Sequence, residues 1–310
     1  MIKCQSATKC GAWEGDLEAI IFLITSMITF LAGVLTHDLT NIKTRKYLLH
    51  SAKIKKDLDF VLLSDLHGRS FGKDNEELIE KIDELDPDMI IMAGDIMTAK
   101  DPFFSIERSV DRAESLIKKL SEKYPVYFGP GNHEERIKWE QWRYSFKYED
   151  MMRRFKEAGA VVLNNESIKL DEYGIRLSCL CMPEKFYKKG SKGLHESDVE
   201  RLIGKASKDF YQMLIAHDPE YIPTYTGWGA DLSMSGHYHG GLVRLPLFGG
   251  LISPKLEIFP KYCGGVYHKG GKRQIVSCGL GTHTYPLRLF NPAELIYVKM
   301  EKEQKDGITG

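Results

Sequence analysis

The sequence predicts an α/β fold with more than one layer of β-sheet, preceded by an apolar helix. Short apolar runs alternate with stretches of helical length in the first half of the chain, which is typical of strands buried on both faces. The second half is richer in strands than in helices, and this favours a further sheet layer. The amino end contains the long apolar run Leu17–Leu35.

After the apolar helix, the predicted strands and helices begin at residue 60. The strands are 60–64, 88–93, 125–129, 160–163, 173–180, 211–216, 231–235, 274–278 and 294–300. The helices are Asp74–Leu85, Ser105–Lys123, Trp139–Ala158 and Ser197–Ser207. Asp74 and Glu77 have the spacing of a capping box at the first of these helices. We find no linker within residues 58–300 and therefore expect one domain there.

The apolar run predicts a membrane anchor. As a helix it would be about 28 Å long, close to the hydrocarbon thickness of a bilayer. A cleaved signal peptide and a buried core helix are the alternatives, but no clear cleavage site follows the run and the helix would have no polar face. More basic residues follow it than precede it, so we expect a single-pass protein with its domain on the cytoplasmic side. The predicted segments are a tail at 1–16, the anchor at 17–35, a polar connector at 36–57, the domain at 58–300 and a tail at 301–310.

The charge balance argues against a protein built to hold nucleic acid. Lys plus Arg and Asp plus Glu each number 43, so the formal net charge is zero, whereas such a protein carries a large basic excess. The 6 cysteines form neither a zinc-knuckle pattern nor a disulfide framework. Cys179 and Cys181 are expected to be small buried residues on one face of a strand. We expect no nucleic-acid partner and a monomer.

Side chains that can bind metals follow the predicted buried strands. They are Asp65 and His67 after 60–64, Asp95 after 88–93, Asn132 and His133 after 125–129, His217 after 211–216, and His237 and His239 after 231–235. Ligands of open α/β sheets gather at the carboxyl ends of strands, so residues distant in sequence can converge there. Any one of them could be an ordinary turn residue. Their repetition predicts a shared site.

Taken in order, the motifs D-x-H, G-D, G-N-H-E, a lone His and G-H-x-H resemble those of the calcineurin-like metallophosphoesterases, over roughly residues 58–300. The resemblance implies a sandwich of two mixed β-sheets flanked by helices. It also implies two divalent ions, Mn, Fe, Zn or similar, which would activate a water molecule and bind a phosphate. By resemblance, Asp65, His67 and His239 would bind the first ion, Asn132, His217 and His237 the second, and Asp95 both.

The resemblance places His133 beside the leaving group, as an acid or a hydrogen-bond donor. Many relatives orient this histidine with the second Asp of G-D-x-x-D, but Thr98 stands at that position here. Asp101 is a candidate substitute. His283 and Arg288 are candidate substrate-binding residues because arginine suits bidentate contact with phosphate; a surface turn is the alternative.

These motifs predict hydrolysis of a phosphomonoester, phosphodiester or pyrophosphate bond. The stretches GHYHGGLVRLPLFG and GLGTHTYPLRLFNPAEL resemble a membrane-anchored bacterial branch of the family, which implies a lipid-linked or cell-envelope substrate. One candidate is the pyrophosphate of a UDP-linked diacylglucosamine in lipid A synthesis; teichoic-acid or nucleotide phosphodiesters are alternatives. The alternative function is a non-catalytic binding module at the membrane, but such a protein would be expected to lose metal ligands, and none is missing.

Overall fold

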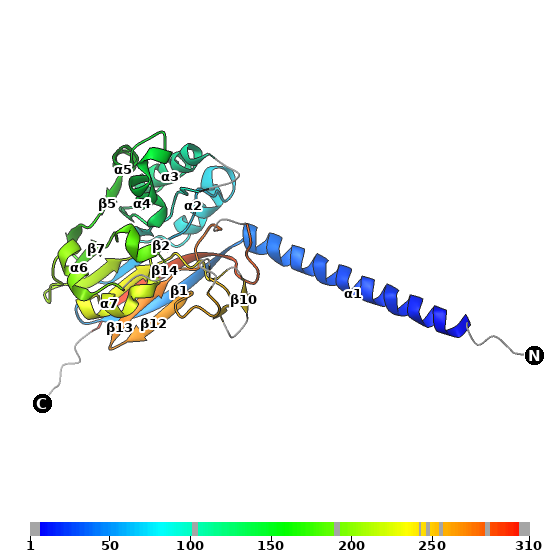
Figure 1. The fold of residues 1–310 in the computed structure, drawn as a ribbon. Coiled ribbons are helices and arrows are strands. Elements are labelled where there is room, and N and C mark those ends of the chain that lie inside the picture. Colours follow the sequence, from blue (N-terminus) through cyan, green and yellow to red (C-terminus); the bar gives the residue numbers. More distant parts are fainter. Residues whose placement is uncertain are drawn as a thin grey trace, which may run out of the picture.

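The computed structural model describes residues 7–100, 105–188, 193–241, 243–245, 249–253, 257–282 and 286–303. Within this part, two six-stranded mixed sheets carry helices on their outer faces, and a long helix leaves the α/β body (Figure 1). The predicted α/β fold with two sheet layers is therefore confirmed.

The first sheet has the order β1-β14-β2-β3-β4-β5. Its strands are β1 (Ile42–Ser51), β14 (Ala293–Lys302), β2 (Leu58–Leu63), β3 (Met89–Ala93), β4 (Val126–Gly129) and β5 (Ala160–Val162). Strands β2 to β5 run parallel, β14 is antiparallel to β2, and β1 is parallel to β14. Because β2, β3 and β4 are parallel, the residues that follow them meet at one edge of the sheet.

The second sheet has the order β12-β13-β9-β8-β7-β6. Its strands are β12 (Gly265–Lys269), β13 (Lys272–Val276), β9 (Leu232–Ser235), β8 (Tyr211–Ile215), β7 (Ile175–Cys179) and β6 (Ser167–Leu170). The central strands β13, β9, β8 and β7 are parallel, and the two edge strands are antiparallel to their neighbours. A short hairpin pairs β10 (Arg244–Leu245) with β11 (Gly249–Gly250).

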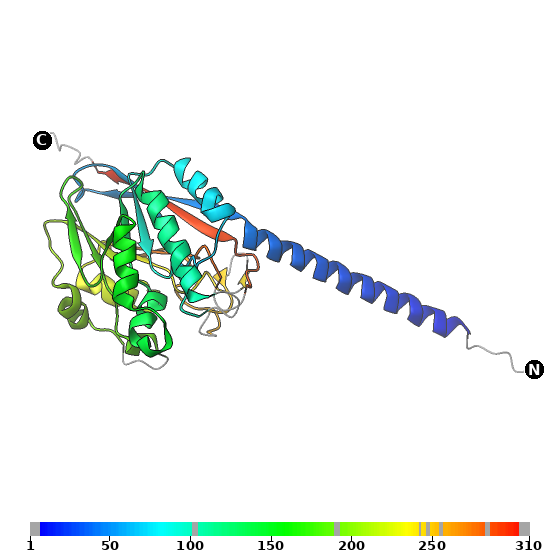
Figure 2. The same ribbon diagram turned by 90° about the horizontal axis from the view of Figure 1, so that it is seen from above.

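Helices cover the outer face of each sheet (Figure 2). They are α2 (Glu76–Asp83), α3 (Ile106–Ser121), α4 (Asn132–Trp139), α5 (Tyr148–Glu157), α6 (Glu196–Ile203) and α7 (Ile222–Trp228), with short 3-10 turns η1 (Lys73–Asn75), η2 (Gln141–Arg143), η3 (Glu184–Tyr187) and η4 (Pro219–Tyr221). Ser105 caps α3 by accepting a hydrogen bond from the Arg108 amide at 3.2 Å.

Burial on both faces explains why the central strands are continuously apolar. Phe60 and Leu62 of β2 pack between the two sheets, whereas Val61 and Leu63 face the helices of the first sheet. A third cluster fills the space between the second sheet and helices α6 and α7. Such strands lack the polar alternation of a half-exposed sheet, so their apolar runs stood out in the sequence.

Two sequence-based expectations for helices are wrong. Instead of one helix over Trp139–Ala158, α4 ends at Trp139 and α5 begins at Tyr148. The side-chain amide of Gln141 donates to the Phe146 carbonyl at 2.8 Å and supports the intervening loop. The capping box at Asp74 is also absent: Asn75 precedes α2, and its side chain accepts from the Phe71 amide at 3.1 Å instead of capping the helix.

Helix α1 (Ala7–Thr40) extends the predicted anchor at both ends. Its segment Asp16–Thr40 is 25 residues long, and the most apolar 18-residue window within it has a mean hydropathy of 2.3 and no buried residue. The helix is therefore long and apolar enough to cross a membrane. Its exposure does not fit a core helix of this chain, whereas a signal sequence would have the same length and composition.

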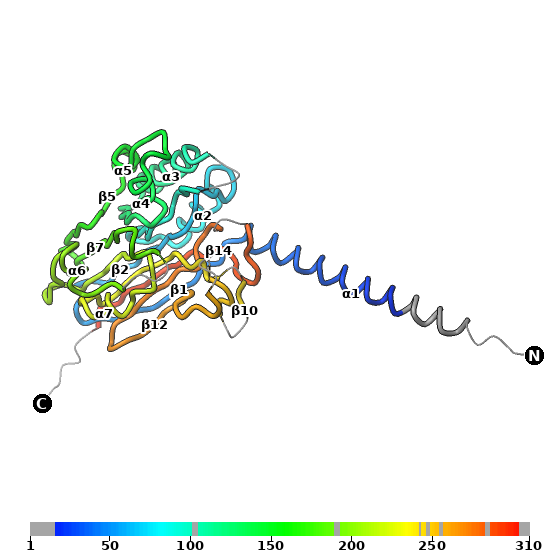
Figure 3. Tube along the Cα trace, in the orientation of Figure 1, coloured from blue at the N-terminus to red at the C-terminus, as the bar shows by residue number. Residues whose placement is uncertain are grey.

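Within the segment 36–57, expected to be a polar connector, residues 36–40 belong to α1 and residues 42–51 form a strand of the first sheet. Strand β1 pairs with β14 along its whole length, from Ile42 opposite Ala293 to Ser51 opposite Lys302. Figure 3 shows these two strands, from opposite ends of the chain, side by side. As an edge strand, β1 carries many polar side chains, which is why its sequence looked like a connector.

Candidate metal centre

Eight predicted site residues lie at the carboxyl ends of five parallel strands, which come from both sheets. Asp65 and His67 follow β2, Asp95 follows β3, Asn132 and His133 begin α4 just after β4, His217 follows β8, and His237 and His239 follow β9. Their side chains are buried, except that 12% of the His237 side chain is exposed. The structure thus brings together residues that span more than half of the sequence.

The backbone is strained where these residues lie. Asp65, His67, Asp95, His237 and His239 all have φ between 50° and 70°. This left-handed region costs a residue other than glycine roughly 1–2 kcal/mol. The fold stabilises it by hydrogen bonds between the two neighbouring loops, from the Asp65 amide to the Gly94 carbonyl and from the His67 amide to the Asp95 carbonyl, both 3.0 Å. Strain of this kind gathers at functional sites.

Asp65, His67 and His239 form the first cluster. Their ligand atoms lie within 4.8 Å of one another. The two Nε2 atoms of His67 and His239 are 3.0 Å apart, and His239 Nε2 is 3.5 Å from Asp65 Oδ1. Imidazole nitrogens bind a metal ion at about 2.1 Å, so two of them this close together could hold the same ion. The spacing fits a shared ion.

Asp95, His217 and His237 form the second cluster, again within 4.8 Å. His217 Nδ1 donates to the Ala93 carbonyl at 2.7 Å, which leaves Nε2 directed at Asp95 Oδ2, 3.0 Å away. A hydrogen bond of this kind fixes the tautomer of a metal-binding histidine. The same Asp95 oxygen is 3.9 Å from His67 Nε2 of the first cluster. Asp95 therefore lies between the clusters.

Asn132 supports the fit of a metal ion to this centre. Its carboxamide oxygen is buried and has no hydrogen-bond partner in the described part of the chain. A buried polar atom without a partner is costly, and a bound cation would satisfy it. Oxygen and imidazole ligands together suit transition-metal ions and do not select one of them.

The two carboxylates of the centre differ in charge environment. Burial raises the pKa of Asp65 to about 6, with the nearby Asp95 adding to the effect and His217 opposing it. Burial acts on Asp95 too, but His217 and His133 outweigh it and hold the pKa of Asp95 well below its usual range. Asp95 is thus the carboxylate that the surrounding imidazoles keep ionised.

Close packing of loops explains the glycines around the site. A Cβ on Gly236 would lie 2.1 Å from Asp65 Oδ2, and one on Gly131 would lie 2.3 Å from Asp95 Oδ1. Asp65 Oδ1 in turn accepts from the His237 amide at 2.9 Å. Glycine is needed beside the histidine pair because a carboxylate from the other sheet occupies the space.

Glu134 holds the Asp95 loop in place, a role that sequence reasoning did not assign. It is fully buried. Its Oε2 accepts from the amides of Gly131 and Asp95, both at 2.9 Å, and its Oε1 from those of Ile96 and Met97, at 2.9 and 3.2 Å. Burial, with the charge of Asp95, raises the pKa of Glu134 to about 7. Glu134 is the last residue of the motif G-N-H-E, which is the feature of the sequence that could have indicated its role.

A backbone amide orients His133 in the place of the missing carboxylate. The amide of Ala99 donates to His133 Nδ1 at 2.9 Å. The Thr98 hydroxyl, 3.2 Å from the same nitrogen, donates to the Lys100 carbonyl at 2.9 Å. Because Nδ1 accepts, the neutral ring carries its proton on Nε2. His133 is therefore fixed as a donor through Nε2. Asp101, the suggested substitute, lies outside the described residues, as does His283.

The expected substrate contact of Arg288 is not what the structure shows. Arg288 is 1% exposed, and its guanidinium donates to the backbone carbonyls of Asn291, Gly281, Cys278 and Pro292. All three of its nitrogens are therefore bonded to main chain. Arg288 thus stabilises the loop before β14 with four of its five N–H groups.

Replacing Arg288 with Gln should reduce stability more than substrate binding. Removing a buried cation that bonds to several carbonyls is expected to cost about 3 kcal/mol. Thermal unfolding of the full chain in detergent should show this loss. The KM of the remaining folded protein for an aryl phosphate should change less than about twofold. A large rise in KM with unchanged stability would restore the substrate-binding role.

The end of α1 is hydrogen-bonded to loops of the metal centre. Asp38 Oδ2 accepts from the Asn291 amide at 2.7 Å, and the Asn291 side chain donates to the His239 carbonyl at 2.6 Å. Arg69, which lies two residues after His67, donates a second hydrogen bond to this end of the helix, at the Leu39 carbonyl. No sequence motif predicted these contacts, because each of them joins residues that are far apart in the chain.

Comparison with known proteins shows to which protein family this chain belongs. Residues 58–241 match the family model described as calcineurin-like phosphoesterase. The match covers more than half of the chain and all eight site residues. The chain therefore belongs to the calcineurin-like phosphoesterase family.

Among individual proteins, the chain is similar to uncharacterized metallophosphoesterases of bacteria. It is 24% identical to one from Helicobacter pylori over 83% of this chain and 64% of that protein, so it matches less than two thirds of that relative. It is 25% identical to YkuE of Bacillus subtilis, over 82% of this chain and 84% of YkuE. It is 23% identical to the phosphodiesterase YaeI of Escherichia coli, over 66% of this chain and 67% of YaeI.

Proposed function

We propose that this chain is a hydrolase that cleaves a phosphoester or phosphoanhydride bond with two divalent ions. Asp65, His67 and His239 bind the first ion. Asn132, His217 and His237 bind the second, and Asp95 bridges them. The observation that carries this proposal is the position of Asp95 between two clusters, 3.0 Å from His217 and 3.9 Å from His67. When bound, the ions supply an activated water and neutralise phosphate charge.

The residues around the ions prepare the site for this chemistry. Asp95 Oδ1 accepts from the His133 amide at 2.7 Å, which couples the bridging carboxylate to the start of α4. The His133 ring lies edge-on to the His67 ring, with centroids 4.6 Å apart, and a His133 ring nitrogen lies within 4.8 Å of the ligand atoms of His67 and Asp95. In this position His133 donates a hydrogen bond to the leaving-group oxygen or to a phosphate oxygen.

We further propose a substrate at the membrane. The hydrogen bonds that Asp38 accepts from Asn291 and Leu39 accepts from Arg69 support this, because Asn291 also donates to the His239 carbonyl and Arg69 follows the loop of His67. They bring the end of the apolar helix next to the metal centre. A lipid-linked or cell-envelope phosphate would reach such a site without leaving the bilayer surface. The pyrophosphate of a UDP-linked diacylglucosamine is one candidate. The distribution of basic residues favours a cytoplasmic location for the domain.

Metal removal tests the proposal directly. Full-length protein in detergent should bind about two divalent ions and hydrolyse aryl phosphate mono- or diesters. Chelation should abolish turnover, and Mn²⁺ should restore it. Bound metal with no turnover of any phosphate ester would favour the binding-module alternative. A protein that binds no divalent ion would contradict both the proposed ligands and the proposed reaction.

His133→Ala is expected to lower kcat by about 100- to 1,000-fold and leave the metal content unchanged, because it removes a donor and no ligand. His133→Gln is the matched variant, since its side-chain amide can place a donor near the position of Nε2. It should recover part of the lost rate. Steady-state kinetics with metal analysis will measure both. Loss of metal in His133→Ala would contradict the proposed role.

A further inference from the structure

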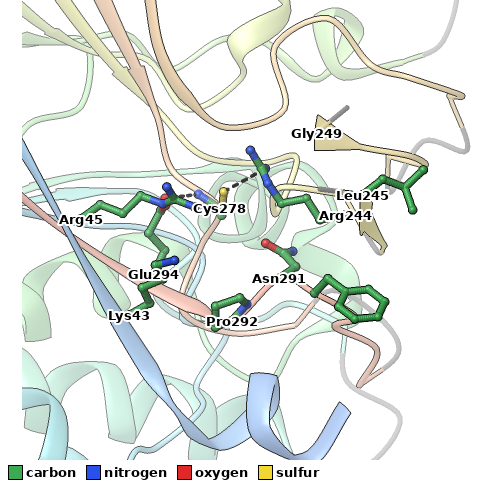
Figure 4. A pocket seen from close by; sticks show the side chains of 10 residues that line it. Lys43, Arg45, Arg244, Leu245, Gly249, Cys278, Asn291, Pro292 and Glu294 are labelled. Carbon is green, nitrogen blue, oxygen red and sulfur yellow. Dashed lines mark hydrogen bonds and ion pairs between the residues drawn. The ribbon is translucent and has the colours of Figure 1, made fainter. Parts of the chain in front are cut away.

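A polar cavity of about 450 Å³ lies just beyond the end of α1, and none of the proposed metal ligands lines it. Figure 4 shows its cationic side chains around Cys278. Lys43 and Arg45 come from β1, and Arg244 comes from β10. Lys43 and Arg45 are two residues apart on one strand and therefore share a face.

The cavity has an excess of positive charge. Glu294 is the carboxylate in its described lining, and it forms an ion pair with Arg45 and accepts from the Cys278 amide at 2.7 Å. Lys43 and Arg244 form no ion pair with any described residue. Arg244 Nη1 instead contacts the Gly240 carbonyl and Cys278 Sγ, both at 3.3 Å. Burial raises the pKa of the Cys278 thiol to about 12, so the thiol is neutral and does not balance this charge.

The cavity also lies beside apolar groups of the membrane helix. Phe290, in its lining, has its ring 6.4 Å from the ring of Phe30, which belongs to the apolar part of α1. Both are exposed, Phe30 by 61% and Phe290 by 40%. Aromatic rings beside an apolar helix, with lysine and arginine next to them, are typical of the headgroup level of a bilayer.

We propose that this cavity binds the phosphate of an anionic phospholipid headgroup in the leaflet that α1 enters. Lys43 and Arg244 supply the two unbalanced charges and donate to the phosphate oxygens, and Phe290 lies against the start of the acyl chains. Attraction of this kind is expected between basic groups and an anionic membrane surface. The inference rests on membrane insertion of α1 and not on hydrolysis at the metal centre.

Calorimetric titration of the full-length protein in uncharged detergent micelles tests this assignment. The probes are short-chain phosphatidylglycerol, short-chain phosphatidylcholine and inorganic phosphate. Phosphatidylglycerol is expected to bind about tenfold more tightly than either of the other two. Arg244→Gln and Lys43→Gln should each weaken its binding by about tenfold, the effect of losing one charge-assisted hydrogen bond.

Lys46→Gln is the matched control, because it removes the same charge from the opposite face of β1, where Lys46 lies over the Tyr297 ring. The Lys46→Gln variant should bind phosphatidylglycerol with the same affinity as the wild type. Arg244 contacts the residue after His239, so the metal content of Arg244→Gln is measured as well. If this variant loses metal, the test depends on Lys43→Gln, because Lys43 is exposed. Unchanged affinity in Lys43→Gln would overturn the proposal. Equal binding of inorganic phosphate would identify a site for free phosphate and overturn the lipid assignment.

Discussion

Replacing Asp95 with Asn should lower turnover by about a thousandfold or more and reduce the bound metal below two ions per chain. An amide has no negative charge with which to bridge two cations, and only one of its two terminal atoms can ligate. Asp95 also accepts from the His133 amide at 2.7 Å, so the change would affect the start of α4 as well. Loss of one preorganised electrostatic group already costs about 100- to 1,000-fold. Metal analysis and steady-state kinetics on the same preparation measure both effects.

Asp231→Asn is the matched control for this experiment. Asp231 precedes β9, at the end of that strand away from His237, and accepts from Lys53 at 2.6 Å and from the Gln212 amide at 2.9 Å. It is therefore a hydrogen-bonded carboxylate of the same domain outside the metal centre. Its replacement should leave metal content and kcat near those of the wild type. If Asp95→Asn kept both ions and full turnover, the proposed two-metal reaction would be excluded.

The sequence predicted the central strands well because burial on both faces leaves a simple pattern. Strands β2 and β3 correspond to the predicted runs 60–64 and 88–93 within two residues. Their carboxyl ends could then be located, and with them the polar residues that follow. Parallel strands bring such residues to one edge, so convergence of Asp65 and Asp95 followed from topology alone.

Elements at the edge of the fold left no such pattern. Strand β1 is mostly exposed or half-buried and has four polar residues in a row at 43–46, and β6 has no buried residue at its four positions. Helix α7 begins with Ile222 and Pro223 and is only seven residues long, too short for a helical period to show. These elements exist because tertiary pairing stabilises them, which local sequence does not report.

The site shows the same limit at the level of single residues. Which side chains gather there could be predicted, but the left-handed backbone of His237 could not, since its amide donates to the Asp65 carboxylate of another loop. The donor that orients His133 is a backbone amide, and every residue except proline has one. Sequence also cannot distinguish an arginine that faces a substrate from one that, like Arg288, donates to buried carbonyls.

Glu134→Gln should lower both stability and turnover, although Glu134 binds no metal in our proposal. Each carboxylate oxygen accepts from two backbone amides: Oε2 from Gly131 and Asp95, and Oε1 from Ile96 and Met97. Glutamine has a single oxygen. Whichever way the side-chain amide is turned, two buried N–H groups would face an NH₂ group and lose their acceptor.

The expected cost of Glu134→Gln is about 3 kcal/mol of stability, which corresponds to a fall of roughly 5–10 °C in melting temperature. Turnover should fall by about 100-fold, because the loop that Glu134 holds carries Asp95. Glu135→Gln is the control: Glu135 is 4% exposed, is the next residue of α4, and accepts from the Tyr148 hydroxyl at 2.7 Å. A glutamine can keep that single bond, so Glu135→Gln should change stability by less than about 1 kcal/mol. Equal melting temperatures for the two variants would show that the four amides do not depend on the Glu134 carboxylate.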